Sequence, residues 1–195
     1  VRIHHWIEHG IDEHLDEHGH GRGGFTTGVV RADGFDSDPI AVSKSKWEET
    51  GKTRASNGGV MRTAGCGCFL FWDEPAVILT SQRFCQVTHY DPRCVFSSVL
   101  ISLIISRLIQ WRCGLLDSFD LDETIGDVKS HFTSDQKNSE DVFINDFTSI
   151  DPFLNATDLD NLCLTDRSVP RTLNTMGCAI WALRMDLSYE EGIER

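Results

Sequence analysis

The sequence lacks an excess of basic residues. Its 195 residues include 30 Asp and Glu against 18 Lys and Arg, which gives a formal net charge of −12. Proteins that bind nucleic acid through its phosphates need a basic surface, and so do proteins that dock on an anionic membrane. We therefore expect neither nucleic acid nor a membrane among its partners. The acidity is concentrated in one stretch, because thirteen acidic residues but only two basic ones lie between Asp117 and Asp166.

Long apolar runs, strand-like patterns and a dense cysteine framework are also missing. The most apolar run, residues 95–109, is interrupted by serines and an arginine. It is shorter than the about 20 residues that a spanning helix needs, so it indicates a helix buried in a core. Strand-like alternation is scarce, which favours an all-α fold. The seven cysteines are scattered and odd in number. They predict free thiols in a reducing compartment, and with no apolar leader at the start of the sequence we expect a cytoplasmic protein.

What the sequence does contain is enough apolar residues, 40% of the chain, for the core of one domain. Asp38-Pro39 and Asp91-Pro92 each read as an N-cap followed by a first-turn proline. They predict one helix that runs through Trp47 to a stop at Gly51, and a second over residues 92–112. Further helices are expected at residues 2–17 and 26–32, from Val60, from Glu74-Pro75, at 175–185, and from a capping box at Ser188–Glu191. The acidic stretch at about 117–166 is expected to be a surface insertion, partly disordered, with one short helix.

Six histidines lie near the start of the sequence: His4, His5, His9, His14, His18 and His20. The pairs His5/His9 and His14/His18 are each one helical turn apart and could chelate a metal ion. The spacings do not converge on one closed four-ligand site, so the favoured interpretation is a solvated helix face that alternates histidine with acidic residues.

Two short blocks could carry chemistry. In the first, Ser56 and Asn57 precede two glycines and the start of an apolar helix. Such a turn can point N–H groups at a phosphate or ribose oxygen, although an ordinary turn is the alternative. In the second, His89 stands two residues before the N-cap Asp91, where it is rigidly held and could reach into a cleft. An ordinary hydrogen-bonded surface histidine is the alternative there.

The two blocks, Ser56–Arg62 and Thr88–Arg93, together resemble the ADP-ribosylglycohydrolase family. Two others, Trp47–Gly51 and Met176–Arg184, are similar to its fungal members, and all four occur in the family's order. The resemblance implies an all-α, orthogonal multi-helix bundle over residues 1–195, incomplete at both ends and carrying the acidic insertion. It also implies hydrolysis of the glycosidic bond between ADP-ribose and a protein side chain or a related acceptor. ADP-ribose or an ADP-ribosylated protein would be the partner.

The resemblance further implies an ADP-ribose site. Its residues would be Ser56, Asn57, Gly58 and Met61, with His89 beside the ligand and Asp91 either assisting or merely capping its helix. The turn around Asn57 and the imidazole of His89 are expected to form opposite walls of one pocket.

The family also uses a pair of magnesium ions, which need carboxylate ligands. Its Thr-Asp-Asp and Asp-x-Asp-Thr boxes are absent from this sequence, and the nearest match, Thr157–Asp160, lies in the acidic stretch. We therefore expect no catalytic or metal-binding residue in this chain and little or no turnover, as in a truncated family member. The alternatives are a metal-free ADP-ribose-binding pseudoenzyme and a structural, crystallin-like or non-functional fragment.

Overall fold

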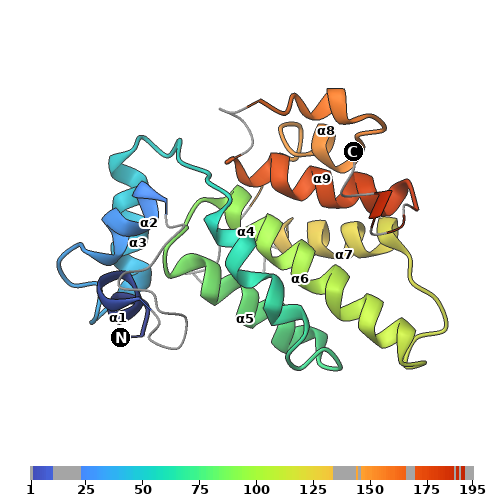
Figure 1. Ribbon diagram of the computed structural model, residues 1–195, viewed down its shortest axis with the longest axis horizontal. Helices are drawn as coiled ribbons and strands as arrows, with labels where there is room; N and C mark the ends of the chain where they lie inside the picture. The colour runs from blue at the N-terminus through green and yellow to red at the C-terminus, as the bar shows by residue number, and fades with distance from the viewer. Residues whose placement is uncertain are drawn as a thin grey trace.

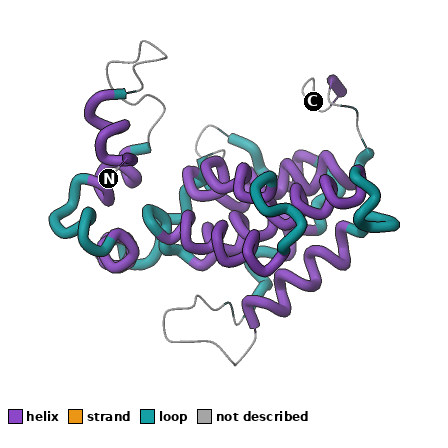
Figure 2. The backbone as a smooth tube through the Cα atoms, turned by 90° about the horizontal axis from the view of Figure 1, so that it is seen from below, coloured by secondary structure: helices purple, strands orange, loops and turns teal. Residues whose placement is uncertain are grey.

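The computed structural model describes residues 2–10, 23–133, 144, 146–165, 170–186, 188 and 190–191, and within these the protein is built from helices (Figure 1). The longer elements are α1 (Arg2–His9), α2 (Gly24–Val30), α3 (Pro39–Glu49), α5 (Glu74–Gln86), α6 (Pro92–Arg112), α7 (Leu121–Thr133) and α9 (Thr172–Arg184). The short ones are α4 (Gly58–Thr63), η2 (Ala64–Gly67), α8 (Asp151–Leu154) and η3 (Leu159–Leu162). Figure 2 shows helices joined by loops over this part of the chain, which confirms the predicted all-α class.

Helix α6 is the centre of the molecule. It packs against α4, α5, α7, α9 and η2, and its side chains Phe96, Val99 and Leu100 are fully buried. Each such side chain contributes roughly 1.5–3 kcal/mol by leaving water. The helix is long and apolar enough to cross a membrane, but most of it is buried inside the protein, as in the core helix of a soluble domain. The prediction of a buried core helix at this place is confirmed.

Aspartate side chains cap several of the described helices, among them α3, α5 and α6. Asp38 accepts a hydrogen bond from the N–H of Ala41, Asp73 from Ala76, and Asp91 from Arg93. Because each cap satisfies a backbone donor that the helix itself cannot, the Asp-Pro pairs located α3 and α6 correctly. Helix α3 ends as predicted, with Gly51 following in the left-handed region at φ 66°.

The N-terminal helices form a small cluster of their own. Ile7, Val29, Val30 and Phe35 are buried together, and Figure 1 shows α1, α2 and α3 side by side at one end of the molecule. The prediction of one helix over residues 2–17 is wrong at Gly10, because α1 ends at His9 and Gly10 follows in the left-handed region at φ 69°. Residues 11–17 lie outside the described residues.

The acidic stretch differs from the surface insertion that the sequence suggested. It contains α7, a thirteen-residue helix whose Ile125, Val128 and Phe132 are buried in the main core. Ile150 and Leu154, from the same stretch, are buried there too. The three side chains on α7 recur at helical spacing, so the helix turns its apolar stripe inward and its acidic residues outward. The expectation of a mere surface excursion is therefore wrong for α7 and for residues 150–154.

Helix α9 is tied directly to the loop that precedes α4. The N–H of Thr172 donates to the carbonyl of Ala55 (3.0 Å), and the N–H of Asn57 donates to that of Pro170 (2.8 Å). Ser56 and Arg171 thereby form an isolated antiparallel bridge. The bridge holds residues far apart in sequence together beside the N-terminus of α6.

The predicted capping box after α9 is present. The N–H of Ser188 donates to the carboxylate of Glu191 (2.9 Å), and the N–H of Glu191 donates to the Ser188 hydroxyl (3.3 Å). These reciprocal bonds confirm a helix start at this position.

Candidate functional site

The segment that joins α5 to α6 and enters the first turn of α6 holds polar side chains of the candidate site. It runs from Thr88 to Arg93, and the N–H of His89 donates to the carbonyl of Cys85 (2.8 Å), which continues the last turn of α5. Thr88, His89 and Asp91 are buried, with at most 1% of each residue exposed. Buried polar groups require partners, and the structure supplies them in two separate clusters.

The first cluster, which we call the His89 network, consists of Ser56, Arg62, Thr88 and His89. Nε2 of His89 lies 2.9 Å from the hydroxyl oxygen of Ser56. Nδ1 lies 2.8 Å from the hydroxyl oxygen of Thr88. The guanidinium of Arg62 donates to the same Thr88 oxygen and, through Nε, to the carbonyl of Gly58 (3.0 Å). The network thus joins α4 to the segment before α6.

These contacts fix the direction of the hydrogen bonds. A guanidinium can only donate, so Thr88 accepts from Arg62. Among the described residues, Nδ1 of His89 is the one acceptor in contact with the Thr88 hydroxyl, so that proton goes to Nδ1. Nε2 then carries the imidazole proton and donates it to Ser56. The Ser56 hydroxyl accepts on the inside and has its own proton left to donate to a ligand.

The environment keeps His89 neutral. Burial, together with the smaller effect of the positive charge of Arg62, lowers the pKa of the imidazole to about 3. A neutral imidazole that donates through Nε2 cannot also take a proton from Ser56. The pair therefore has the distance of a serine–histidine nucleophile but not its protonation.

The two glycines of the turn are required by close packing. Gly58 and Gly59 are the first residues of α4, and neither has a positive φ. A Cβ atom on Gly58 would lie 3.0 Å from Cε1 of His89, and one on Gly59 would lie 2.8 Å from Sγ of Cys85. The imidazole therefore touches the turn directly. The expectation that the turn and His89 form opposite walls of one pocket is wrong at this contact.

The other residues expected near ADP-ribose lie outside the His89 network. Met61 is 64% exposed on α4. Asn57 is half-buried, and its side chain makes no capping hydrogen bond. The structure thus brings Ser56, Gly58 and His89 together. The side chains of Asn57 and Met61 take no part in the hydrogen bonds of the His89 network.

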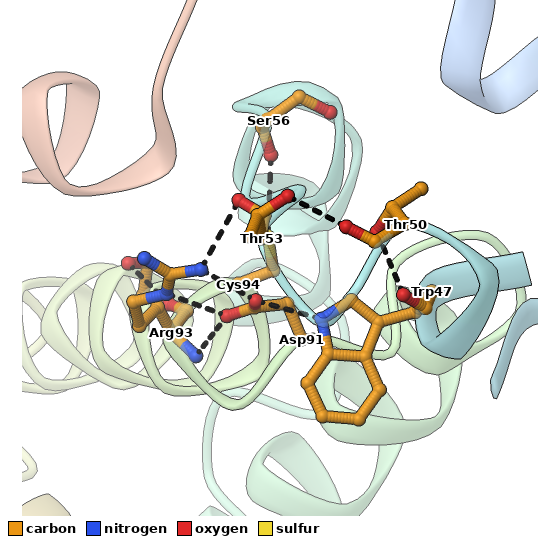
Figure 3. Close-up of polar contacts among 8 residues, drawn as sticks. Trp47, Thr50, Thr53, Ser56, Asp91, Arg93 and Cys94 are labelled. Atoms are coloured by element: carbon orange, nitrogen blue, oxygen red, sulfur yellow. Dashed lines mark hydrogen bonds and ion pairs between the residues drawn. The ribbon is translucent and has the colours of Figure 1, made fainter.

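Asp91 belongs to the second cluster, with Trp47 and Arg93 (Figure 3). Its Oδ2 accepts from Nε1 of Trp47 (2.8 Å) and from Nη2 of Arg93 (2.7 Å). Its Oδ1 accepts from the backbone N–H and from Nε of Arg93, both at 2.9 Å. The hydrogen bond to Asp91 is the main reason that the pKa of Arg93 is raised. Asp91 was expected either to assist beside the ligand or to cap its helix, and these contacts are those of a helix cap.

The sequence did not identify four residues of these clusters as functional: Trp47, Arg62, Thr88 and Arg93. All four lie in the blocks that resemble the family. Arg62 could have been found, because it follows Gly58 by one helical turn. The partnership of Trp47 with Asp91 spans 44 positions, and no local pattern predicts it.

The histidine-rich start of the chain is only partly described. His14, His18 and His20 lie outside the described residues. The rings of His5 and His9 are 4.7 Å apart, while His4 contacts Glu8 (3.3 Å) and Asp36 (3.5 Å). Within the described ranges, no group of three or more His, Cys, Asp or Glu side chains is arranged to hold a metal ion.

The carboxylates of Asp91 and of the nearest box match do not fit a magnesium pair. Asp91 is fully engaged with Trp47 and Arg93. Asp158, in the nearest sequence match to a family box, caps η3 by accepting from the N–H of Asp160 (3.0 Å). Magnesium needs several hard oxygen ligands, and these two carboxylates do not supply them.

The described residues form an all-α protein in which the glycine turn lies against the segment before α6. The chain belongs to the ADP-ribosylglycohydrolase family, whose model matches residues 1–195, the whole chain. No curated protein and no solved structure matches it. Membership supports a glycohydrolase-like function and suggests ADP-ribosylated substrates and metal-dependent hydrolysis.

Proposed function

We propose that this chain binds ADP-ribose, free or attached to a protein, at the Ser56–Met61 turn, and that it does not hydrolyse the glycosidic bond by itself. The observation that carries the proposal is the direction of the His89 network. Arg62, Thr88 and His89 orient Ser56 as a donor whose proton has no acceptor among the described residues. A pre-oriented hydroxyl donor suits a phosphate or ribose oxygen.

The same geometry argues against turnover. Hydrolysis needs a group that takes a proton from the attacking water. His89 is neutral and uses Nε2 as a donor, and the carboxylate of Asp91 already accepts four hydrogen bonds. Neither cluster therefore offers a free general base.

Calorimetry with ADP-ribose on the 195-residue chain tests the binding. We expect saturable micromolar binding, weakened by about tenfold or more in Ser56→Ala because a hydrogen bond to a charged group is lost. Asn57→Ala should also weaken binding, since its side chain is free of capping. Ser130→Ala, on the exposed face of α7, is the matched control and should bind like the wild type. The absence of binding heat at millimolar ADP-ribose would remove the proposal.

The absence of turnover needs its own assay. Incubating the chain with an ADP-ribosylated peptide and Mg²⁺ should release no ADP-ribose above the rate without protein. Release that depends on Mg²⁺ would contradict the inactivity and leave the binding intact.

A structural role is the second candidate, and one observation favours it. Both nitrogens of the buried His89 are occupied, and its ring lies against Gly58, as in a packing element. Cooperative unfolding of a chain that binds no ADP-ribose would support this role over the first.

A further inference from the structure

Large apolar side chains are exposed near the C-terminal end of α6. Phe69, Leu70 and Trp72 lie in the loop between η2 and α5, and Leu115 lies in the loop after α6. Between 45% and 78% of each of these residues is exposed. At roughly 200 Å² for a large side chain, they leave about 500 Å² of apolar surface in contact with water. Apolar surface of that extent marks an interaction site. We call these four residues the apolar end.

Helix α6 holds the two loops side by side. The hydroxyl of Ser106 donates to the carbonyl of Phe71 (2.8 Å). One helical turn further on, the carbonyl of Gln110 accepts from the N–H of Leu115 (2.8 Å). The Gln110 side chain also donates to the Ser106 hydroxyl (3.2 Å). Because the two loops are anchored one turn apart on the same helix, their apolar side chains lie at one end of the molecule.

The loop before α5 is held in a fixed conformation. Leu70 lies in the left-handed region at φ 58°, and its carbonyl accepts from the N–H of Asp73 (2.7 Å). A residue other than glycine keeps such a conformation only where its surroundings impose it. The ring of Phe71 meets that of Trp72 edge-on, with centroids 5.1 Å apart. An apolar surface that is ordered in advance costs less entropy on binding.

An acidic cavity adjoins the apolar end. Its volume is about 130 Å³, and its lining includes Glu74, Arg107, Leu116, Phe119, Asp120 and Glu123. Glu74 follows Trp72 by two residues, and Leu116 follows Leu115 directly. Arg107 is already paired with Glu74 (2.9 Å) and Asp127 (2.7 Å), so the cavity keeps a negative charge. It is smaller than the about 300 Å³ of small-molecule sites, and it suits a single cationic side chain.

Charge decides which partner fits this surface. A second copy of the chain would bring the same acidic rim against its own, because a two-fold contact joins identical surfaces. An anionic membrane would be repelled in the same way, since the chain carries a formal net charge of −12. A basic amphipathic protein segment complements both features, with apolar side chains for the exposed residues and cationic ones for the rim.

We infer that the apolar end and the acidic cavity beside it bind a basic amphipathic segment of a partner protein. The apolar side of that segment packs on Phe69, Trp72 and Leu115, and one of its lysine or arginine side chains enters the cavity. The inference does not rest on ADP-ribose binding, and no bond is made or broken at this surface.

A dye-labelled amphipathic helical peptide of leucine and lysine tests the inference on the 195-residue chain by fluorescence anisotropy. We expect saturable binding, about tenfold or more tighter than that of a leucine–glutamate peptide with the same pattern. Phe69→Ser should weaken binding of the leucine–lysine peptide about tenfold or more. Phe69 is exposed, so this variant should fold, and its thermal transition provides the check.

The matched control is Phe84→Ser, which removes another exposed phenylalanine from the opposite end of α5. It should bind the leucine–lysine peptide like the wild type. Equal weakening in Phe69→Ser and Phe84→Ser would overturn the location. Absence of binding, or equal affinity for the two peptides, would overturn the inference as a whole.

The acidic rim has its own pair of variants. Asp117→Asn/Glu123→Gln removes two exposed charges beside the apolar end and should weaken binding of the leucine–lysine peptide about tenfold. Asp33→Asn/Glu48→Gln removes two exposed charges near α2 and α3, at the other end of the molecule (Figure 1), and should leave the affinity unchanged. Equal weakening in the two double variants would reflect net charge alone and overturn the role of the rim.

Two further measurements test the choice of partner. Equilibrium sedimentation should show a monomer, and phosphatidylcholine vesicles should not bind the chain. A dimer that Phe69→Ser dissociates, or vesicle binding that Phe69→Ser abolishes, would overturn the assignment to a basic protein segment.

Discussion

The two polar clusters of this protein begin in the same six-residue segment and satisfy their buried groups in opposite ways. In the His89 network, the imidazole is buried beside an arginine and contacts no carboxylate of the described residues. It therefore stays neutral and passes hydrogen bonds in one direction. In the second cluster, a buried carboxylate faces an arginine and an indole and forms a compact ion pair. The comparison shows that burial favours the neutral form of an ionisable side chain, and that a buried charge is kept where an oppositely charged partner contacts it.

The largest effect is expected from breaking the ion pair. Asp91→Ala leaves the guanidinium of Arg93 and the indole N–H of Trp47 without their acceptor, at a cost of about 4 kcal/mol of unfolding free energy. Asp38→Ala is the matched control, because Asp38 caps α3 in an equivalent Asp-Pro pair but is exposed. Its loss should cost about 1 kcal/mol. Urea unfolding measures both. Equal losses would mean that Asp91 is only a cap.

The neutral cluster should respond to pH. The pKa of His89 is about 3 in the folded protein and 6.5 in the unfolded chain, so the unfolded chain binds the extra proton between these values. Its contribution to stability is complete above pH 6.5 and is lost as the pH falls toward 3. Between pH 7 and 5, the wild type should lose about 2 kcal/mol more than His89→Gln, which cannot titrate. Identical pH dependence in urea unfolding would show that His89 is not held neutral.

The contact between the turn and the network can be tested by adding a methyl group. Gly59→Ala places a Cβ atom 2.8 Å from the Cys85 sulfur and should cost about 1.5 kcal/mol by overpacking. Gly126→Ala on α7 is the control, because nothing lies within 4 Å of its added atom. It should gain about 0.5 kcal/mol from higher helix propensity. Thermal unfolding should therefore shift in opposite directions, and a parallel shift would argue against close packing at the turn.

The smallest effect concerns the indole. Trp47→Phe keeps an aromatic ring but removes the donor to Asp91, and it should cost about 1 kcal/mol. Trp72→Phe, at a 62% exposed position, should change the unfolding free energy by less than about 0.5 kcal/mol. Similar changes in unfolding free energy for the two variants would mean that the hydrogen bond from Trp47 to Asp91 does not stabilise the protein.

The sequence predicted the helix starts that depend on residues close together in the chain. Aspartate caps located α3 and α6, and the capping box at Ser188 was found, because the partners are at most three residues apart. Helix α7 was missed as a core element because its acidic residues obscured the spacing of Ile125, Val128 and Phe132.

The candidate site was predictable only in part. The two blocks were paired by resemblance, and the structure joins them through Ser56 and His89, which are 33 positions apart. The burial of His89, its contact with Gly58 and the role of Trp47 all depend on how the helices pack. Neither local propensity nor spacing contains that information.

The central claim is that His89 is neutral and donates through Nε2 to Ser56. Nitrogen chemical shifts of the imidazole, measured by NMR on labelled protein at pH 6, test it most directly. The account predicts a neutral ring with a protonated Nε2 and an unprotonated Nδ1, and loss of this pattern in Thr88→Val. A ring protonated at Nδ1, at both nitrogens, or unchanged by Thr88→Val would contradict it.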